Sequence, residues 1–271
     1  MKYGDVTLGQ VEAAINNLGG LDNWNAWLRG ELTLEISEVV PKMFDKNGRR
    51  IPPRGLEYAV CDPDTNFRLN QPEIDYAGVI NRLQRSFPSV MGNGRFLSAE
   101  DFKQKAEALL EQLRQDEFLA NLLKGIWLPV CFPRLRIKNY GQSLEEIFLP
   151  AVENSYKNQF PDRVFENYRR GELAAAVTMV EGSRHEMLLS RMEEGPIVGI
   201  MFFPLQGFSV LAQREQMTSL PSSLLLSGAV DMATARVAYP EVMARDWNTP
   251  GYDCSAVNFR SSAASLLFPG H

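Results

Sequence analysis

The sequence predicts a mixed α/β protein, with α+β as the alternative: an N-terminal helical hairpin and a larger domain in which helices cover a sheet. Capped amphipathic segments alternate with short apolar runs after residue 126, which is typical of a helix-covered sheet. With 271 residues, 45% of them hydrophobic, the chain can bury a substantial core and exceeds the usual size of one domain. We expect a hairpin module at 1–30, an irregular connecting region with short strands and one helix at 31–95, and the main α/β domain at 96–271.

The first thirty residues carry the clearest local signals. Thr7 and Gln10 have the spacing of a capping box, in which each side chain satisfies a free backbone amide. One apolar helical face then follows, and Gly19-Gly20 ends it; its members are Leu8, Val11, Ile15 and Leu18. Asp22 is placed to cap a second short helix that carries Trp24, Trp27 and Leu28. Such a hairpin cannot bury its aromatic face alone, so we expect it to dock on another surface.

Residues 31–95 predict less regular structure. Alternation in 32–36 favours a strand, and the Pro- and Gly-rich stretch 41–72 allows at most short strands such as Leu56–Val60. A helix is expected around 75–85. The turn-forming residues 86–95 are the expected domain boundary.

The main domain predicts alternating elements. Ser98 with Asp101, Ser143 with Glu146, and Ser183 with Glu186 each indicate the start of a helix. Pro150 predicts a kink or an early end in the second of these. The remaining expected elements are an extended segment at 127–138, a helix or strand at 172–180, a buried strand at 196–203, helices at 209–219 and 229–239, and a strand at 265–268.

Composition excludes several classes of protein. The formal net charge of -5 argues against nucleic-acid binding over the whole surface, because phosphate binding requires concentrated Lys and Arg. No apolar run approaches the roughly 18–20 residues of a membrane span, and the first residues lack the apolar region of a secretory signal. The three cysteines are far apart and odd in number, which favours reduced thiols in a cytoplasmic protein.

Well-known catalytic motifs are missing from the sequence. The chain has two histidines, and Leu189 stands where a His-Glu-x-x-His zinc motif beginning at His185 requires its second histidine. Neither a phosphate-binding loop nor a dinucleotide-binding glycine pattern is present. Residues 207–211 approach the nucleophile-elbow pattern, but Leu211 replaces its second glycine. We therefore predict no metal site and no cofactor.

His185 is the first candidate for a functional site. It shares an apolar helical face with Leu188, Leu189 and Met192, and a neutral imidazole there is suited to act as a general base. The alternative is a structural histidine at the boundary of the core. As catalytic partners we considered Asp246, Asp253 and Cys254, which with His185 supply a base, an orienting acid and a nucleophile.

Two further groups are candidates for ligand binding. Arg134, Arg136 and Lys138 point to one side if their segment is extended, and such a row suits a small anionic ligand or an acidic partner. The same row is also typical of a solvated sheet face. Asn248 and Tyr252 belong to the polar stretch 245–256, which either forms a binding loop or is a well-anchored turn.

The start of the helix after Gly228 is a weaker candidate. Its free amides are suited to an anion, but Asp231 already occupies the favourable field at that helix end. We favour a tight turn into the helix, with small residues that pack closely.

The segments EGSRHEMLLSRMEEGPIVGIMFFPLQGFSVLAQREQMTSLP, ARDWNTPGYDCSA and VEAAINNLGGLDNWNAWLRGEL together resemble a set of uncharacterised bacterial proteins with no assigned activity. The resemblance implies a bacterial, intracellular origin and transfers no functional residue. The N-terminal segment is similar to a module that precedes otherwise different bacterial proteins, which implies an attachment element.

Two hypotheses on function remain. The favoured one is an intracellular binding or interaction protein, whose partner is a protein or a small anionic ligand and which forms a homo-oligomer through the hairpin or docks it on its own chain. The alternative is an enzyme, a hydrolase or transferase without a histidine-rich metal site, that uses His185 and the 245–256 loop.

Overall fold

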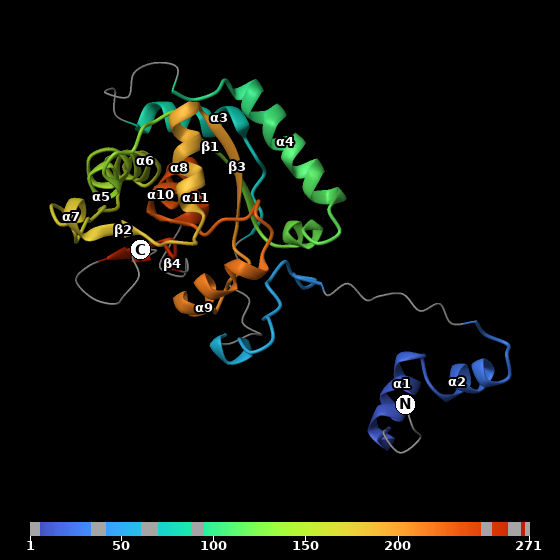
Figure 1. Cartoon of the computed structure of the whole chain (residues 1–271). Helices are drawn as coiled ribbons and strands as arrows, with labels where there is room; N and C mark the ends of the chain where they lie inside the picture. The colour runs from blue at the N-terminus through green and yellow to red at the C-terminus, as the bar shows by residue number, and fades with distance from the viewer. Residues whose placement is uncertain are drawn as a thin grey trace. The chain divides into compact units, whose positions relative to one another are not determined.

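The computed structural model describes residues 6–33, 42–60, 70–87, 95–244 and 251–259, and the backbone of 267–268. The contacts divide the chain into two compact units, Met1–Pro41 and Lys42–His271. The protein has a mixed α/β fold, in which helices predominate and the strands of the described residues pair as small antiparallel ribbons (Figure 1).

The first unit is a helical hairpin, as the sequence predicts. Helix α1 (Leu8–Asn17) begins at a capping box in which Thr7 and Gln10 bond each other's backbone amides, at 2.8 and 3.3 Å. Gly19 and Gly20, both with positive φ, end it. Helix α2 (Leu21–Leu28) starts directly after Gly20, so Asp22 lies in its first turn and is not its cap. Neither helix contains a buried residue.

The second unit is built around helix α10 (Ala229–Ala238), in which all ten residues are buried. Helices α3 (Tyr76–Ser86) and α6 (Leu149–Gln159) and strand β1 (Trp127–Phe132) pack against it (Figure 1). The last carbonyls of α10 are satisfied from these neighbours. The Ser155 hydroxyl donates to the carbonyl of Val237 at 2.9 Å, and Arg82 Nε donates to that of Ala238 at 2.8 Å.

The sheet that we expected to be covered by helices is a two-stranded ribbon. Strand β1 pairs antiparallel with β3 (Ile197–Phe202), with Trp127 opposite Phe202 and Phe132 opposite Ile197. Helix α4 (Ala99–Gln115) packs against β3. Two smaller ribbons pair β2 (Val177–Met179) with β5 (Val257–Phe259), and β4 (Tyr252–Asp253) with β6 (Leu267–Phe268). The pairs join distant segments, so no local pattern in the sequence specifies them.

Several expected helices occur close to their predicted ranges. Asp75 caps α3 and Ser98 caps α4, each accepting from an amide three residues later. The predicted helix at 209–219 is α9 (Val210–Glu215), capped by Ser209, followed by a 3-10 turn η6 (Gln216–Ser219). Residues 172–180, for which the sequence allowed a helix or a strand, contain one of each: α7 (Leu173–Ala176) leads directly into β2.

Other local predictions need correction. Leu56–Val60 is not a strand: a 3-10 turn η2 (Glu57–Ala59) occupies it, and Val60 forms an isolated bridge to Phe208. The helix predicted from Ser143 begins one turn earlier, because Asn139 caps α5 (Tyr140–Ser143). That helix continues through a π-helical turn η5 (Leu144–Phe148) into α6, so Pro150 does not end it. A proline lacks the amide of an α-helical hydrogen bond, and the wider π turn directly before it accommodates that loss.

Much of the expected connecting region belongs to the larger unit. Helix α3 packs against α4, α6 and α10. Arg50 is buried, and its guanidinium donates to the side chains of Gln216 and Ser219 at 3.1 and 3.2 Å. The predicted strand 32–36 and the expected boundary at 86–95 lie largely outside the described residues. The remaining elements are the 3-10 helix η4 (Ala120–Lys124), α8 (His185–Glu194) and α11 (Pro240–Met243).

Candidate functional site

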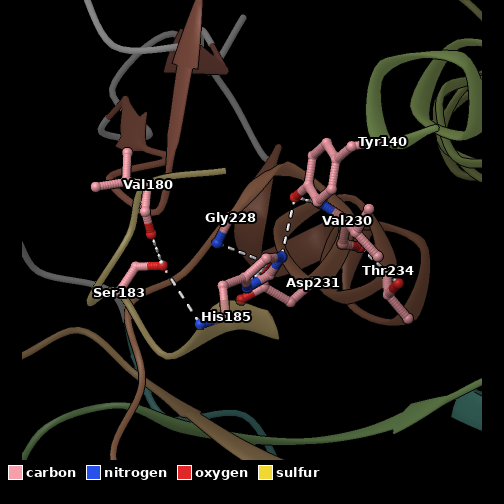
Figure 2. Close-up of polar contacts among 8 residues, drawn as sticks. All are labelled: Tyr140, Val180, Ser183, His185, Gly228, Val230, Asp231 and Thr234. Carbon is pink, nitrogen blue, oxygen red and sulfur yellow. Dashed lines mark hydrogen bonds and ion pairs between the residues drawn. The ribbon is translucent and has the colours of Figure 1, made fainter. Parts of the chain in front are cut away.

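A chain of buried polar side chains lies at the start of α10. His185, the first residue of α8, is completely buried between Tyr140 of α5 and Asp231 of α10 (Figure 2). Tyr140 Oη lies 3.0 Å from His185 Nε2, and His185 Nδ1 lies 4.0 Å from Asp231 Oδ1. We call these three residues the Tyr140–His185–Asp231 cluster.

Hydrogen-bond accounting assigns the proton of each group. Tyr140 Oη accepts from the amide of Val230 at 3.1 Å, which leaves the hydroxyl hydrogen free to donate to His185 Nε2. A neutral imidazole that accepts at Nε2 carries its hydrogen on Nδ1. That hydrogen faces Asp231, although at 4.0 Å the contact is longer than a hydrogen bond, and Nδ1 has no other partner among the described residues.

Asp231 serves the helix as well as the histidine. It is the third residue of α10, and its Oδ1 accepts from the amide of Gly228 at 2.7 Å. Burial raises the pKa of its carboxyl group, while His185 and backbone amides at the helix start act in the opposite direction. The carboxylate therefore takes the place that an external anion would need at this helix end.

A backbone in the left-handed conformation places His185 in the cluster. Arg184 has φ of 62°, the only positive φ of a non-glycine residue in the described parts of the chain. Such a conformation costs roughly 1–3 kcal/mol. The Arg184 guanidinium offsets that cost by donating to four backbone carbonyls at 2.6 to 3.1 Å, those of Met217, Leu220, Pro221 and Leu224.

The same contacts fix the turn that leads into α10. Leu226 donates its amide to the carbonyl of Ser183 at 3.0 Å, and Ser183 Oγ accepts from the amide of His185 at 3.3 Å. Ser183 Oγ also donates to the carbonyl of Val180 at 2.6 Å (Figure 2). The segment before α8 and the segment before α10 are thereby held in one arrangement.

Gly228 permits His185 and Tyr140 to approach the start of α10 closely. A Cβ atom at this position would lie 2.6 Å from both His185 Nε2 and Tyr140 Oη. The structure confirms the tight, small-residue turn that we favoured here. There is consequently no space for even a methyl group beside the two reactive atoms.

The order Asp231, His185, Tyr140 matches an acid, a base and a hydroxyl in a proton-withdrawing relay. The amide of Val230 would also stabilise negative charge on Tyr140 Oη. Yet burial and the nearby Asp231 raise the pKa of Tyr140 well above its ordinary value. Gly228 packs directly against the hydroxyl, with no space for a methyl group between them. In this arrangement the cluster joins α5, α8 and α10.

The recorded hydrogen bonds of His185 go to Tyr140 and Ser183, and neither of its described predicted partners, Asp253 and Cys254, is among them. Asp253 is partly buried and accepts from Gln213 Nε2 at 3.3 Å. Cys254 is completely buried, and burial together with Asp231 raises the pKa of its thiol well above the ordinary value, which disfavours the nucleophilic thiolate. Tyr252 is buried, with the Arg236 guanidinium 5.6 Å from its ring centroid. Asp246 and Asn248 lie outside the described residues.

The cationic row is exposed, as the alternation of residues 134–138 predicts. Arg134, Arg136 and Lys138 are exposed, whereas Leu135 and Ile137 between them are partly buried. Arg136 forms an ion pair with Glu193, with Nε 2.9 Å from Oε1. Within the parts of the chain that are described, no group of three His, Cys, Asp or Glu side chains has the arrangement of a metal site.

Sequence reasoning identified His185 but missed Tyr140. The two residues are 45 positions apart, and Tyr140 and Val230 are 90 apart, so no local spacing could connect them. Comparisons with protein-family models, with curated proteins and with solved structures give no match. The roles assigned to these residues therefore rest on their geometry in this chain.

Replacing Tyr140 by Phe tests the hydroxyl at the centre of the cluster. The variant leaves the Val230 amide and His185 Nε2 buried without this partner, so we expect the free energy of unfolding to fall by about 1–3 kcal/mol. Urea denaturation measures the change. The control Tyr168→Phe alters a residue that is 70% exposed, and its effect should stay within about 0.5 kcal/mol. Equal effects of the two variants would contradict this role.

Replacing Gly228 by Ala tests the close approach. The new methyl group must displace Tyr140 or His185, and we expect a loss of about 1–3 kcal/mol in the free energy of unfolding. Gly195→Ala is the matched control, because nothing lies within 4 Å of its Cβ position and its φ of -176° suits any residue. If the Gly228→Ala protein is as stable as the control, the space between residue 228 and the side chains of Tyr140 and His185 is wider than the structure shows.

The raised pKa of Asp231 predicts that the free energy of unfolding depends on pH. Its pKa is raised above the ordinary 3.8, so its contribution to stability is complete below pH 3.8 and is lost as pH rises through the folded-state pKa. Asp231→Asn keeps an oxygen for the Gly228 amide but does not titrate. The free energy of unfolding of the wild type, minus that of the variant, should fall as pH rises above 3.8. Urea denaturation over a pH series gives the answer, and a flat or rising difference would contradict the assignment.

Proposed function

We propose that this protein is an interaction protein whose N-terminal hairpin attaches the larger unit to a protein partner. One observation carries this proposal: no residue of α1 or α2 is buried. Helices of ten and eight residues are shorter than the roughly 12–15 residues at which isolated helices become even marginally stable. Their stability must come from packing against another surface.

The side chains that such a surface would cover are apolar. Leu8 is 89% exposed, Leu21 63% and Leu28 62%. Val11 and Trp27 are also exposed, and Trp27 lies against Trp24 with ring centroids 5.2 Å apart. Complete burial of one such side chain contributes roughly 1.5–3 kcal/mol, so a partner that covers the set would stabilise the hairpin strongly.

Charge and cysteine usage bear on the setting. Among the described residues, no helix combines the length and apolar character that crossing a bilayer requires. Cys131 and Cys254 are free, buried thiols, which supports a reducing compartment such as the cytoplasm. Binding of a small anion by the row Arg134, Arg136 and Lys138 has weaker support than binding of a protein partner. The reason is that Arg136, the middle residue of the row, is already paired with Glu193.

The alternative hypothesis of an enzyme has weaker support. It requires a substrate next to His185, Cys254 or an aspartate, and both His185 and Cys254 are completely buried. The only relay that His185 forms with described residues ends at Tyr140, beside the closed packing at Gly228.

Affinity capture with the tagged full-length protein tests the interaction. A protein retained from the source cells is identified, purified and titrated against the wild type and Leu28→Glu. The variant places a charge among the exposed apolar side chains, so we expect its dissociation constant to rise at least about tenfold. Ala13→Glu, on the opposite and exposed side of α1, should bind like the wild type. A partner that binds all three proteins equally, or no partner in the purified titration, would contradict the proposal.

A further inference from the structure

Strand β3 has one edge that pairs with β1 and an outer edge that pairs with no strand of the described residues (Figure 1). The residues of β1 show which backbone groups point to that outer edge. Pro129 has no amide hydrogen, and both backbone groups of Trp127 bond the side chain of Gln71, at 2.9 and 3.0 Å. Trp127 and Pro129 therefore form non-hydrogen-bonded pairs with the residues opposite them, which are Phe202 and Ile200.

In such a pair, the amide and the carbonyl of each residue point away from the partner strand. Because the pattern alternates along the strand, Val198, Ile200 and Phe202 all present both groups at the outer edge of β3. No hydrogen bond of the described residues satisfies any of these groups. Five of the six residues of β3 are only partly buried, whereas five of the six residues of β1 are buried. The outer edge of β3 therefore lies on the exposed side of the ribbon, with its backbone groups unpaired.

This edge has none of the features by which proteins keep other strands away. Protected edge strands contain a proline, a lysine or another charged residue, or a bulge. Residues 197–202 have the sequence IVGIMF, and their register with β1 is unbroken. On the outer edge of β1, by contrast, Gln71 bonds Trp127, and the Tyr239 hydroxyl donates to the carbonyl of Pro129 at 2.6 Å. Side chains thus cover part of the β1 edge, and the β3 edge is left open.

A contact within the chain shows what kind of group fits beside this edge. Two residues beyond Phe202, the carbonyl of Pro204 accepts from the backbone amide of Arg50 at 2.8 Å. Arg50 also forms an antiparallel bridge with Phe44, so a paired backbone segment already lies beside the end of β3. Alternating amides and carbonyls at strand spacing are the groups that an extended peptide satisfies when it adds a strand to a sheet.

We propose that the outer edge of β3 binds an extended peptide segment of a protein partner, which pairs with Val198, Ile200 and Phe202 and makes the ribbon three-stranded. The side chains of that segment lie beside the apolar side chains of β3, so uncharged β-branched or aromatic residues suit it. The site belongs to the larger unit and does not depend on the hairpin, so it is a second contact surface beyond the proposed function.

Amide hydrogen exchange of the free protein, measured by NMR, tests whether the edge is open. The amides of Val198, Ile200 and Phe202 should exchange at least about tenfold faster than those of Gly199 and Met201, which bond β1. Equal protection of the two sets, at any protein concentration, would mean that another segment or a second copy covers the edge, and it would overturn the proposal.

A peptide selection tests the binding itself. A phage-displayed library of random peptides, each long enough to pair with all six residues of β3, is selected against the full chain. A synthetic copy of a selected peptide should slow the exchange of the Val198, Ile200 and Phe202 amides. Methylation of its alternate backbone amides removes donors and keeps the side chains. The dissociation constant of the methylated peptide should therefore be at least about tenfold higher.

A variant of the edge completes the test. Ile200→Pro removes an outward amide, and proline is tolerated at such positions of an edge strand. The dissociation constant of the selected peptide should again rise at least about tenfold, while protected Gly199 and Met201 amides show that the ribbon is intact. If this variant does not fold, the methylated peptide decides. Leu28→Glu, the control in the hairpin, should bind like the wild type. A library without a binder, equal binding of the methylated peptide or of folded Ile200→Pro, or release by Leu28→Glu overturns the proposal.

Discussion

Helix α10 lies in the core of the larger unit without one exposed residue, so every polar group at its two ends must find a partner inside the protein. Asp231 bonds the amide of Gly228, and Tyr140 takes the amide of Val230. At the other end, Ser155 and Arg82 satisfy the carbonyls of Val237 and Ala238. The helices that pack against α10 therefore carry the side chains that satisfy these polar groups.

The Tyr140–His185–Asp231 cluster follows from the same constraint. Tyr140 accepts from the Val230 amide, and its own buried hydroxyl hydrogen needs an acceptor, which His185 supplies. His185 reaches that position because Arg184 adopts a left-handed backbone and donates to four carbonyls of the turns that precede α10. A buried polar network of this kind costs stability when one member is missing, and it favours a single arrangement of the helices that it joins. The cluster thus links three helices of the core through buried polar contacts.

The two units differ in how far their apolar side chains are exposed. The larger unit covers its central helix on all sides, whereas the hairpin leaves Leu8, Leu21 and Leu28 more than 60% exposed. A short helical hairpin with exposed leucines and hardly any cations is suited to protein contact. This contrast is the observation on which the proposed interaction function rests.

The sequence by itself determined the local structure. The Thr7–Gln10 box, the cap Ser98 and the glycine pair after α1 each act within a few residues, so their chemistry is visible without a fold. The exposed side of residues 134–138 was likewise predictable from alternation. His185 was recognisable as unusual, but its partners were not.

Only the tertiary structure decided which distant groups meet. Tyr140, His185 and Val230 come from three separate segments, and β1 pairs with β3 across about seventy residues of chain, a range over which spacing carries no information. Ser143 has the sequence of a helix cap, yet Asn139 caps the helix one turn earlier, because a helix start is set by where the chain leaves its neighbours. Burial, too, is a property of the assembled core: the sequence does not show that Cys254 and His185 are both completely buried in it.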